Sequence, residues 1–208
     1  MRPDRLAYAG QMSRWAPDAR ERLETAALEL FVENGYEQTT VAQIAERADL
    51  NRATFFRHFT DKREVLFGGE DVLAGLFGDA IRNAPSDATP AECLQAAFTA
   101  AETAMTPRQR ARAAQRVQVL AANAEVQERG LLKHARMAGS IGAALRARGV
   151  DELTARLSAE VGLLAFRIAV ERWMRSDEGE PFAPLAVAAL SDLQTRAAEL
   201  DSPSRTSA

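Results

Sequence analysis

Apolar residues recur every three or four positions along most of the 208-residue chain, which is the spacing of amphipathic α-helices. The first such segment begins at a potential capping box, Asp18 with Glu21, and ends at Asn34-Gly35, a pair typical of helix C-termini. Alternation of apolar and polar residues, which would indicate strands, is nearly absent. The pattern therefore predicts an all-α protein.

Two short helices are predicted next. A second capping box, Thr40 with Gln43, begins one helix, and Asp49 ends it. Asn51 is a typical N-cap for the following helix, which should end near residues 58–59.

Longer helices are predicted over the rest of the chain. A fourth helix should begin at Asp61 and run toward Ile81, followed by a linker at residues 83–90, NAPSDATP. Beyond the linker, helices are predicted near residues 90–104, 108–123, 125–148, 152–176 and 183–200.

The third helix has an aromatic side and a polar side. At 100° per residue, Phe55, Phe56 and Phe59 fall within about a third of its circumference. Because so short a helix is unstable alone, we expect all three rings to pack on the two preceding helices. The other side carries Asn51, Ala53, Thr54, Arg57 and His58, with Arg52 at the N-terminal end. Two short helices, of which the second is exposed and cationic, indicate a helix-turn-helix that reads the DNA major groove.

Charge supports this interpretation only locally. The formal net charge of −3 gives the whole chain no general attraction for nucleic acid. Residues 51–63, however, carry four cations, Arg52, Arg57, Lys62 and Arg63, against the one carboxylate of Asp61.

The segment from Ala27 to Phe67, ALELFVENGYEQTTVAQIAERADLNRATFFRHFTDKREVLF, resembles the tetracycline-repressor (TetR/AcrR) family of bacterial transcriptional regulators. The resemblance covers about residues 18–67 and implies an N-terminal three-helix helix-turn-helix domain with a C-terminal helical bundle. The expected organisation is a flexible arm at 1–17, a DNA-binding domain at 18–67, a ligand-binding and dimerisation domain at 68–200, and a disordered tail at 201–208.

The resemblance also assigns roles to single positions. Thr40 would contact phosphate, Lys62 would anchor the DNA backbone, and His58 would lie against the phosphates. The full predicted DNA-binding set is Thr39, Thr40, Gln43, Asn51, Arg52, Ala53, Thr54, Phe56, Arg57, His58 and Lys62. Three positions depart from the family pattern. Asp49 stands where glycine is usual in the turn, and Phe56 replaces a tyrosine whose hydroxyl would bond a phosphate. Ala53 replaces a frequent glycine and can still contact a thymine methyl group. Aspartate tolerates the left-handed conformation such a turn needs.

The predicted helix at 152–176 has two apolar stripes, which indicates burial on two sides. One runs through Leu153, Leu157, Val161, Leu164 and Ile168, and the other through Gly162, Phe166, Ala169, Val170 and Trp173. One stripe can serve the protein's own core and the other a twin helix across a two-fold axis. The predicted homodimer interface is Phe166, Val170, Trp173, Leu185, Ala189 and Leu193; a buried helix in a monomer is the alternative.

A small, largely apolar effector is expected among the middle helices. Its predicted contacts are Phe98, Met105, Arg116, His134 and Met137, of which Arg116 and His134 could instead be ordinary surface residues. The resulting hypothesis is a dimeric repressor that binds an inverted-repeat DNA operator and is released by this effector. A dimeric regulator or activator without a ligand is the alternative.

An enzyme is the remote alternative. The chain has only two histidines and one cysteine, and it lacks a phosphate-binding glycine loop, a metal-ligand spacing and a nucleophile elbow. These features argue against an enzyme, so no metal or cofactor is expected.

No apolar run is long enough to span a bilayer. The lone Cys93 excludes an internal disulfide, is expected to be buried, and suits the reducing cytoplasm.

Overall fold

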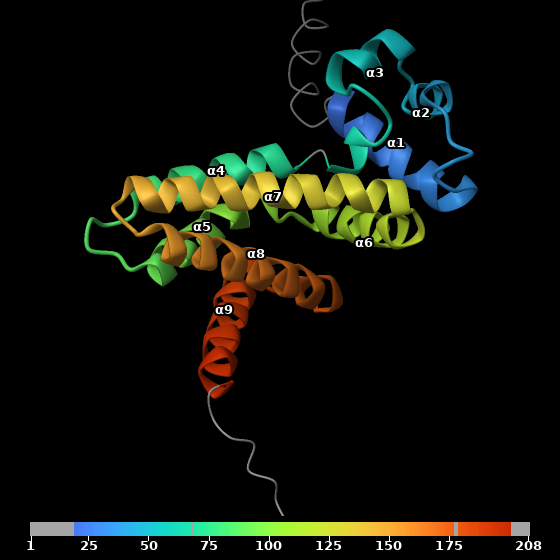
Figure 1. Ribbon diagram of the computed structural model, residues 1–208. Coiled ribbons are helices and arrows are strands. Elements are labelled where there is room, and N and C mark those ends of the chain that lie inside the picture. The colour runs from blue at the N-terminus through green and yellow to red at the C-terminus, as the bar shows by residue number, and fades with distance from the viewer. Residues whose placement is uncertain (1–18, 68, 177–178, 201–208) are drawn as a thin grey trace, which may run out of the picture. The chain divides into compact units, whose positions relative to one another are not determined.

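The computed structural model describes residues 19–67, 69–176 and 179–200, and every regular element within these ranges is helical (Figure 1). The chain divides into two compact units between Gly68 and Gly69. None of the described helices combines the length and apolarity needed to cross a membrane. The predicted arm at 1–17, the predicted tail at 201–208 and the capping residue Asp18 lie outside the described residues.

The first unit, here called the head, consists of α1 (Ala19–Asn34), α2 (Val41–Arg47), α3 (Arg52–His58) and the 3₁₀ helix η2 (Glu64–Phe67). One apolar core joins them, formed by the buried side chains of Leu23, Ala27, Phe31, Ile44, Phe55, Phe59, Val65 and Leu66. Each helix is too short to be stable alone, so this shared core holds all of them.

Local signals in the sequence set the helix boundaries in the head. Gly35 adopts φ 86° directly after α1, a left-handed conformation that glycine takes without steric cost, and its N–H donates to Phe31 O at 3.1 Å. The Thr40 hydroxyl accepts from the Gln43 N–H, and the Gln43 side chain accepts from the Thr40 N–H at 2.8 Å. Both predicted boundaries are confirmed.

The prediction of a continuous fourth helix from Asp61 is wrong. Asp61 Oδ1 instead accepts from the N–H groups of Arg63 and Glu64, at 2.8 and 3.2 Å, which fixes the tight turn before η2. Partial burial alone would raise the pKa of Asp61, but hydrogen bonds from Arg63 and Glu64 outweigh it and lower the pKa. Glycine loses more backbone conformational freedom than any other residue when it enters a helix, so the sequence Gly68-Gly69 disfavours a helix. Helix α4 begins only after this pair.

The second unit, here called the C-terminal domain, contains α4 (Glu70–Asn83), α5 (Pro90–Ala101), the 3₁₀ helix η3 (Glu102–Ala104), α6 (Pro107–Ala122), α7 (Ala124–Ala147), α8 (Glu152–Arg175) and α9 (Phe182–Glu199). The predicted linker lies between α4 and α5, and each helix predicted beyond it is present.

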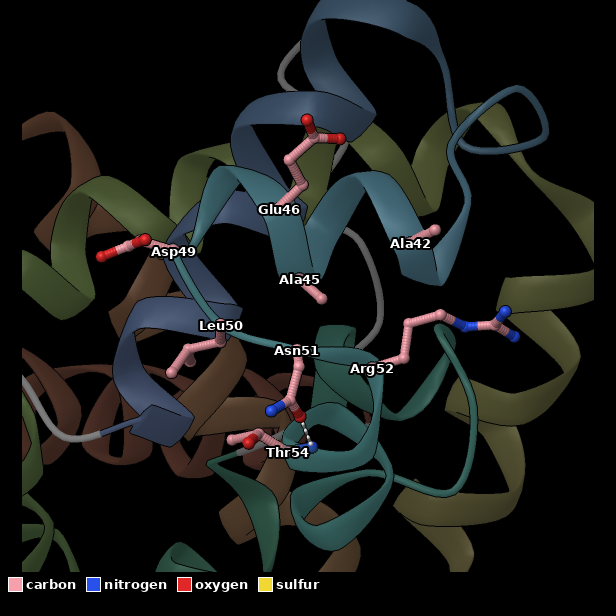
Figure 2. A pocket seen from close by; sticks show the side chains of 8 residues that line it. All are labelled: Ala42, Ala45, Glu46, Asp49, Leu50, Asn51, Arg52 and Thr54. Carbon is pink, nitrogen blue, oxygen red and sulfur yellow. Dashed lines mark hydrogen bonds between the residues drawn. The ribbon is translucent and has the colours of Figure 1, made fainter.

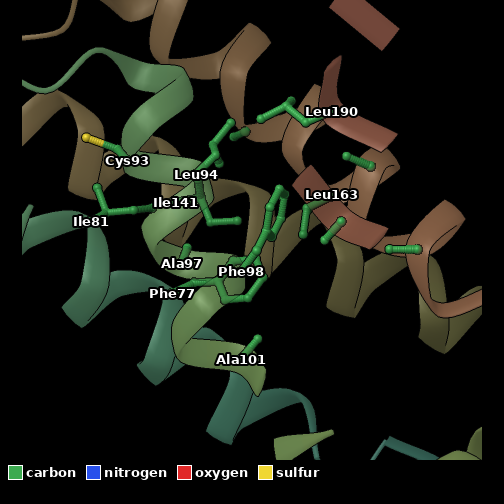
Figure 3. Close-up of a cluster of buried hydrophobic side chains, with 14 of the residues drawn as sticks. Phe77, Ile81, Cys93, Leu94, Ala97, Phe98, Ala101, Ile141, Leu163 and Leu190 are labelled. Carbon is green, nitrogen blue, oxygen red and sulfur yellow. The ribbon is translucent and has the colours of Figure 1, made fainter. Parts of the chain in front are cut away.

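A chain of aromatic rings crosses the core of the C-terminal domain. Figure 3 shows two of these residues, Phe77 and Phe98, within the core. Phe77 of α4 packs edge to face against Phe98 of α5 and Phe166 of α8, at centroid distances of 6.0 and 5.4 Å. Phe166 and Trp173 of α8 both contact Phe182 of α9, at 5.1 and 6.1 Å. Four helices therefore meet around one set of rings. Cys93 is buried in the same core, as predicted.

Helices α5 and α8 approach each other closely at Gly162. A Cβ atom placed there would lie 2.6 Å from Cδ2 of Leu94, which is itself 2% exposed. Glycine at this position therefore sets the separation of the two helices.

A carboxylate from the end of α5 caps the beginning of α9. Pro181, the N-cap residue of α9, has no side-chain cap of its own. Glu102 supplies one, because its two carboxylate oxygens accept from the N–H groups of Phe182 and Ala183 at 3.0 and 2.5 Å. A negative charge is also favourable at the positive end of the helix dipole.

Replacing Glu102 by alanine should lower the free energy of unfolding by about 1–2 kcal/mol, since two N–H groups of α9 would have no acceptor. Glu102→Gln keeps one acceptor oxygen and should cost less than half as much. Urea denaturation followed by circular dichroism measures both. Equal stability of Glu102→Ala and the wild type would contradict a stabilising cap.

Candidate DNA-binding surface

Helix α3 is anchored by its N-cap and by two of its three phenylalanines. The Asn51 side-chain oxygen accepts from the Thr54 N–H at 2.8 Å, which confirms the predicted cap. Phe55 and Phe59 are buried, at 0% and 4% exposure, whereas Phe56 is 51% exposed. The prediction that Phe56 packs inward is wrong. The helix ends at His58 and Phe59 is extended (φ −138°, ψ 138°). Phe56 lies about 100° around the helix from Phe55, which places it at the edge of the buried side.

The outward side of α3, here called the reading face, consists of Arg52, Ala53, Phe56 and Arg57, all of them exposed. Within the described part of the chain, neither arginine makes a hydrogen bond or an ion pair with the protein. Both guanidinium groups are thus available to an external partner.

The turn between α2 and α3 is held by a side chain from α1. Asp49 adopts φ 53°, the left-handed conformation expected where glycine is usual. The guanidinium group of Arg22 donates to the carbonyl oxygens of Ala48 and Asp49, at 3.2 Å for the latter, and lies 3.5 Å from the Asp49 carboxylate. Arg22 therefore fixes the direction in which the chain enters α3.

Helices α1 and α2 are also joined on their outer sides. Arg47 bonds the carboxylates of Glu33 and Glu29, at 2.7 and 3.4 Å. The hydrogen bond between Arg47 and Glu33 lowers the pKa of Glu33 and raises the pKa of Arg47. The guanidinium group of Arg47 is therefore bonded within the head, whereas those of Arg52 and Arg57 form no such bond with the described residues.

A hollow of about 570 Å³ opens between α2 and α3 (Figure 2). Its lining residues are Ala42, Ala45, Glu46, Asp49, Leu50, Asn51, Arg52 and Thr54. Figure 2 shows the Arg52 side chain extending away from the helices, while Asn51 turns back to the Thr54 backbone. The small side chains of α2 leave this space beside the reading face open.

Lys62 has a different role from the predicted DNA contact. Its ammonium group donates to the carbonyl oxygens of Tyr36, Glu37 and Thr39, at 2.8, 3.3 and 3.1 Å. It also lies 4.3 Å from the centroid of the Tyr36 ring. An ammonium has three N–H donors, and each has an acceptor within the head. Lys62 therefore fastens the segment before η2 to the loop between α1 and α2.

Two predicted DNA contacts are buried. Thr39 is 1% exposed. Its hydroxyl donates to the carbonyl oxygens of Leu30 and Gly35, at 3.2 and 2.8 Å, and so provides a donor for acceptors at the end of α1. Thr54 is 9% exposed. Both are corrections to the predicted set. Of the rest, Thr40 and Gln43 are exposed at the beginning of α2, and His58 is half-buried with its ring beside Phe59.

Comparison with known proteins identifies this arrangement. Residues 24–67 match the family described as bacterial regulatory proteins, tetR family. The chain carries a DNA-binding domain of the TetR family. The matched range includes α2, the turn with Asp49, α3 and η2, so the reading face of this TetR head occupies the family's helix-turn-helix.

Sequence similarity to curated relatives covers only part of the chain. The regulator TcmR of Streptomyces glaucescens is 41% identical over 81 residues, which cover 39% of this chain and 36% of TcmR. The chain thus matches little more than a third of the length of this relative.

Similarity to solved structures extends over most of the chain. Thermus thermophilus FadR, a TetR-family repressor determined with lauroyl-CoA, covers 84% of this chain and 93% of its own, with 25% identity and a TM-score of 0.50. SmeT, the repressor of the Stenotrophomonas maltophilia multidrug efflux pump SmeDEF, covers 88% and 90%, with 20% identity and a TM-score of 0.52. The likeness to SmeT shows a shared fold.

The predicted effector residues do not form one group. Phe98 is fully buried in the aromatic core, and Met105 and Met137 are half-buried against it. Arg116 donates to the Gln109 side chain at 3.3 Å. His134 instead pairs with Glu160 at 2.9 Å, and both side chains are about half exposed. His134 therefore lies at the surface with its partner, whereas Phe98 lies in the interior.

A second hollow, of about 320 Å³, opens between α7 and α8. It is lined by Ala135, Ala138, Gly139, Gly142, Arg146, Glu152, Arg156, Ala159 and Glu160, and none of the five predicted effector residues is among them. Among the described residues, no group of three or more histidine, cysteine or carboxylate side chains is placed to hold a metal ion.

The predicted interface residues Trp173 and Ala189 belong to the core of the C-terminal domain. Their side chains are 4% and 0% exposed, because the stripe with Gly162 and Phe166 packs against α5 and α9. Phe166, Val170, Leu185 and Leu193 are half-buried against the same core. In the other stripe of α8, Leu153 is 76% exposed and Leu157 is 62% exposed, whereas Val161 and Ile168 are half-buried against the core. The burial of Trp173 and Ala189 argues against their predicted place in an interface, and the four half-buried residues stay a prediction.

Replacing Lys62 by methionine should lower the free energy of unfolding by about 2–3 kcal/mol, because three carbonyl groups would have no charged donor. The salt dependence of DNA binding should not change for the folded fraction. Urea denaturation and the slope of log Kd against log salt concentration test this. A slope reduced by about one, with stability unchanged, would instead show that Lys62 contacts a phosphate.

Proposed function

We propose that this protein is a homodimeric transcriptional repressor that binds an inverted-repeat operator and is released by a small effector. The observation that carries the proposal is the reading face. It has two arginines that form no hydrogen bond or ion pair with the described residues, on a helix whose position is fixed by its cap, its buried rings and Arg22. Arginine is the commonest reader of guanine in the major groove. The TetR-family match of residues 24–67 supports the same role.

The small size of the reading face favours a dimer, because a single head would bind DNA weakly. One short helix buries little surface on DNA, whereas two heads about 34–36 Å apart can bind two half-sites at once and gain effective affinity. The exposed leucines of α8 support an interface there, since Leu153 and Leu157 lie one turn apart on the same side of the helix. Large exposed apolar side chains gathered on one face mark an interaction site.

Effector release is proposed from the division into a head and a C-terminal domain, together with the lauroyl-CoA bound by the similar Thermus thermophilus FadR. An effector can remove the repressor only if it binds the DNA-incompetent state more tightly, and that difference in affinity is the driving force. We also propose that the protein acts in the cytoplasm, and that its activity is the regulation of transcription and not catalysis.

The proposal is tested by incubating the purified protein with genomic fragments at about 150 mM salt and sequencing what it retains. Recovery of a short inverted repeat supports a dimeric sequence-specific regulator. To remove co-purified effector, the experiment is repeated after unfolding, dialysis and refolding. Recovery of no enriched sequence in either preparation would refute the proposal.

Arg52→Ala and Arg57→Ala should each weaken operator binding by about 1–3 kcal/mol, because the guanidinium group that reads a base is removed, without changing the melting temperature. Fluorescence anisotropy with the selected operator measures this. Arg136→Ala, which removes an exposed arginine from α7 and changes the net charge equally, is the matched control. Equal weakening in all three variants would indicate a general charge effect in place of a reading face.

Leu157→Arg should give folded monomers that bind the operator poorly, because a charge is placed in the proposed α8 interface. Leu131→Arg, at a 73% exposed leucine of α7, is the control and should remain dimeric. Light scattering after size exclusion gives the mass of each variant. A dimeric Leu157→Arg protein would place the interface elsewhere.

A further inference from the structure

The chemical groups of the reading face follow a definite order around α3. At 100° per residue, Arg52, Phe56, Ala53 and Arg57 follow one another over an arc of about 140°. Two apolar groups therefore lie side by side between two cations. The remaining inner positions, Thr54 and Phe55, are buried, so this strip is the outward surface of the helix.

Phe56 has a defined orientation although it is half exposed. Its ring stands edge to face against Phe55, with centroids 5.5 Å apart and an interplanar angle of 83°. Phe55 is fully buried and also contacts Phe59 at 5.5 Å. The exposed ring of Phe56 therefore packs against a residue of the core of the head.

A phenyl ring and a methyl group have no hydrogen-bonding group, so an apolar group is a suitable partner for both. Neither can donate to a phosphate oxygen or to the edge of a base. In the major groove, the apolar group that distinguishes base pairs is the C5-methyl group of thymine. The C5 position of 5-methylcytosine carries the same group, so the two bases share the chemistry that this strip could bind.

We propose that Phe56 and Ala53 form a binding strip for a pyrimidine C5-methyl group, flanked by guanines that Arg52 and Arg57 read. This inference rests on the proposed DNA-binding function and adds the class of base that the centre of the reading face selects. The half-site recovered from genomic fragments should then contain a methyl-bearing pyrimidine beside guanine.

The test replaces each thymine of the selected half-site by deoxyuridine, which removes the methyl group and leaves the hydrogen-bonding edge unchanged. At one or two positions, Kd should rise about fourfold for each half-site methyl, and about 15-fold when both half-sites are changed. In a parallel series, each cytosine is replaced by 5-methylcytosine. A response in the first series identifies thymine as the source of the methyl, and tightening in the second identifies 5-methylcytosine.

Variants of the protein test whether the change in Kd on removal of the methyl group depends on Phe56. Phe56→Ala should bind the thymine operator more weakly than the wild type and should become insensitive to deoxyuridine at the same position. Phe56→Tyr keeps the ring and should keep the sensitivity. Arg57→Ala, which weakens binding through a different contact, should also keep it. Thermal melts confirm that each variant is folded.

The inference is overturned if the wild type binds all substituted operators as it binds the unmodified one. It is also overturned if deoxyuridine weakens the binding of Phe56→Ala by the same factor as that of the wild type at every position, since the methyl contact then belongs to another residue. Failure of the wild type to bind any DNA sequence would instead refute the proposed function, which keeps the two outcomes distinct.

Discussion

Two cationic side chains hold the backbone at the two ends of α2, and the position of the reading face depends on them. Lys62 bonds three carbonyl groups of the loop before α2, and Arg22 bonds two carbonyl groups of the turn after it. Such carbonyls have no partner within a helix, and leaving them unsatisfied near the core would be costly. A seven-residue helix thus gains a fixed position from residues that lie outside it.

The sequence was sufficient to predict those features of the head that arise from neighbouring residues. The Thr40–Gln43 box, the Asn51 cap and the glycine after α1 each depend on residues within a few positions of one another. The left-handed turn at Asp49 is equally local. Where the sequence failed, the cause was contact between distant segments. Lys62 finds its acceptors more than twenty positions earlier, and no local pattern indicates that its donors are used there.

Periodicity was similarly limited in both units. It placed Phe56 on the buried side with Phe55 and Phe59, although Phe56 lies about 100° around the helix from Phe55 and is 51% exposed. On α8 it found two apolar stripes but could not say which of their residues pack on the protein's own core. The answer depends on where α5 and α9 pack, and hence on Gly162 and the aromatic rings around Phe182. Similarly, Glu102 caps a helix that begins 80 positions away.

The separation between the two sides of α3 has a consequence for how such a protein can evolve. In the function proposed here, recognition and folding use different residues of the same seven-residue helix: the outward four meet the solvent, and the inward ones complete the core. Mutations on the outward side can therefore alter the preferred DNA sequence while the head keeps its fold. A lineage could move from one operator to another through a series of stable intermediates, with each step limited by the match to DNA and not by the cost of refolding the domain.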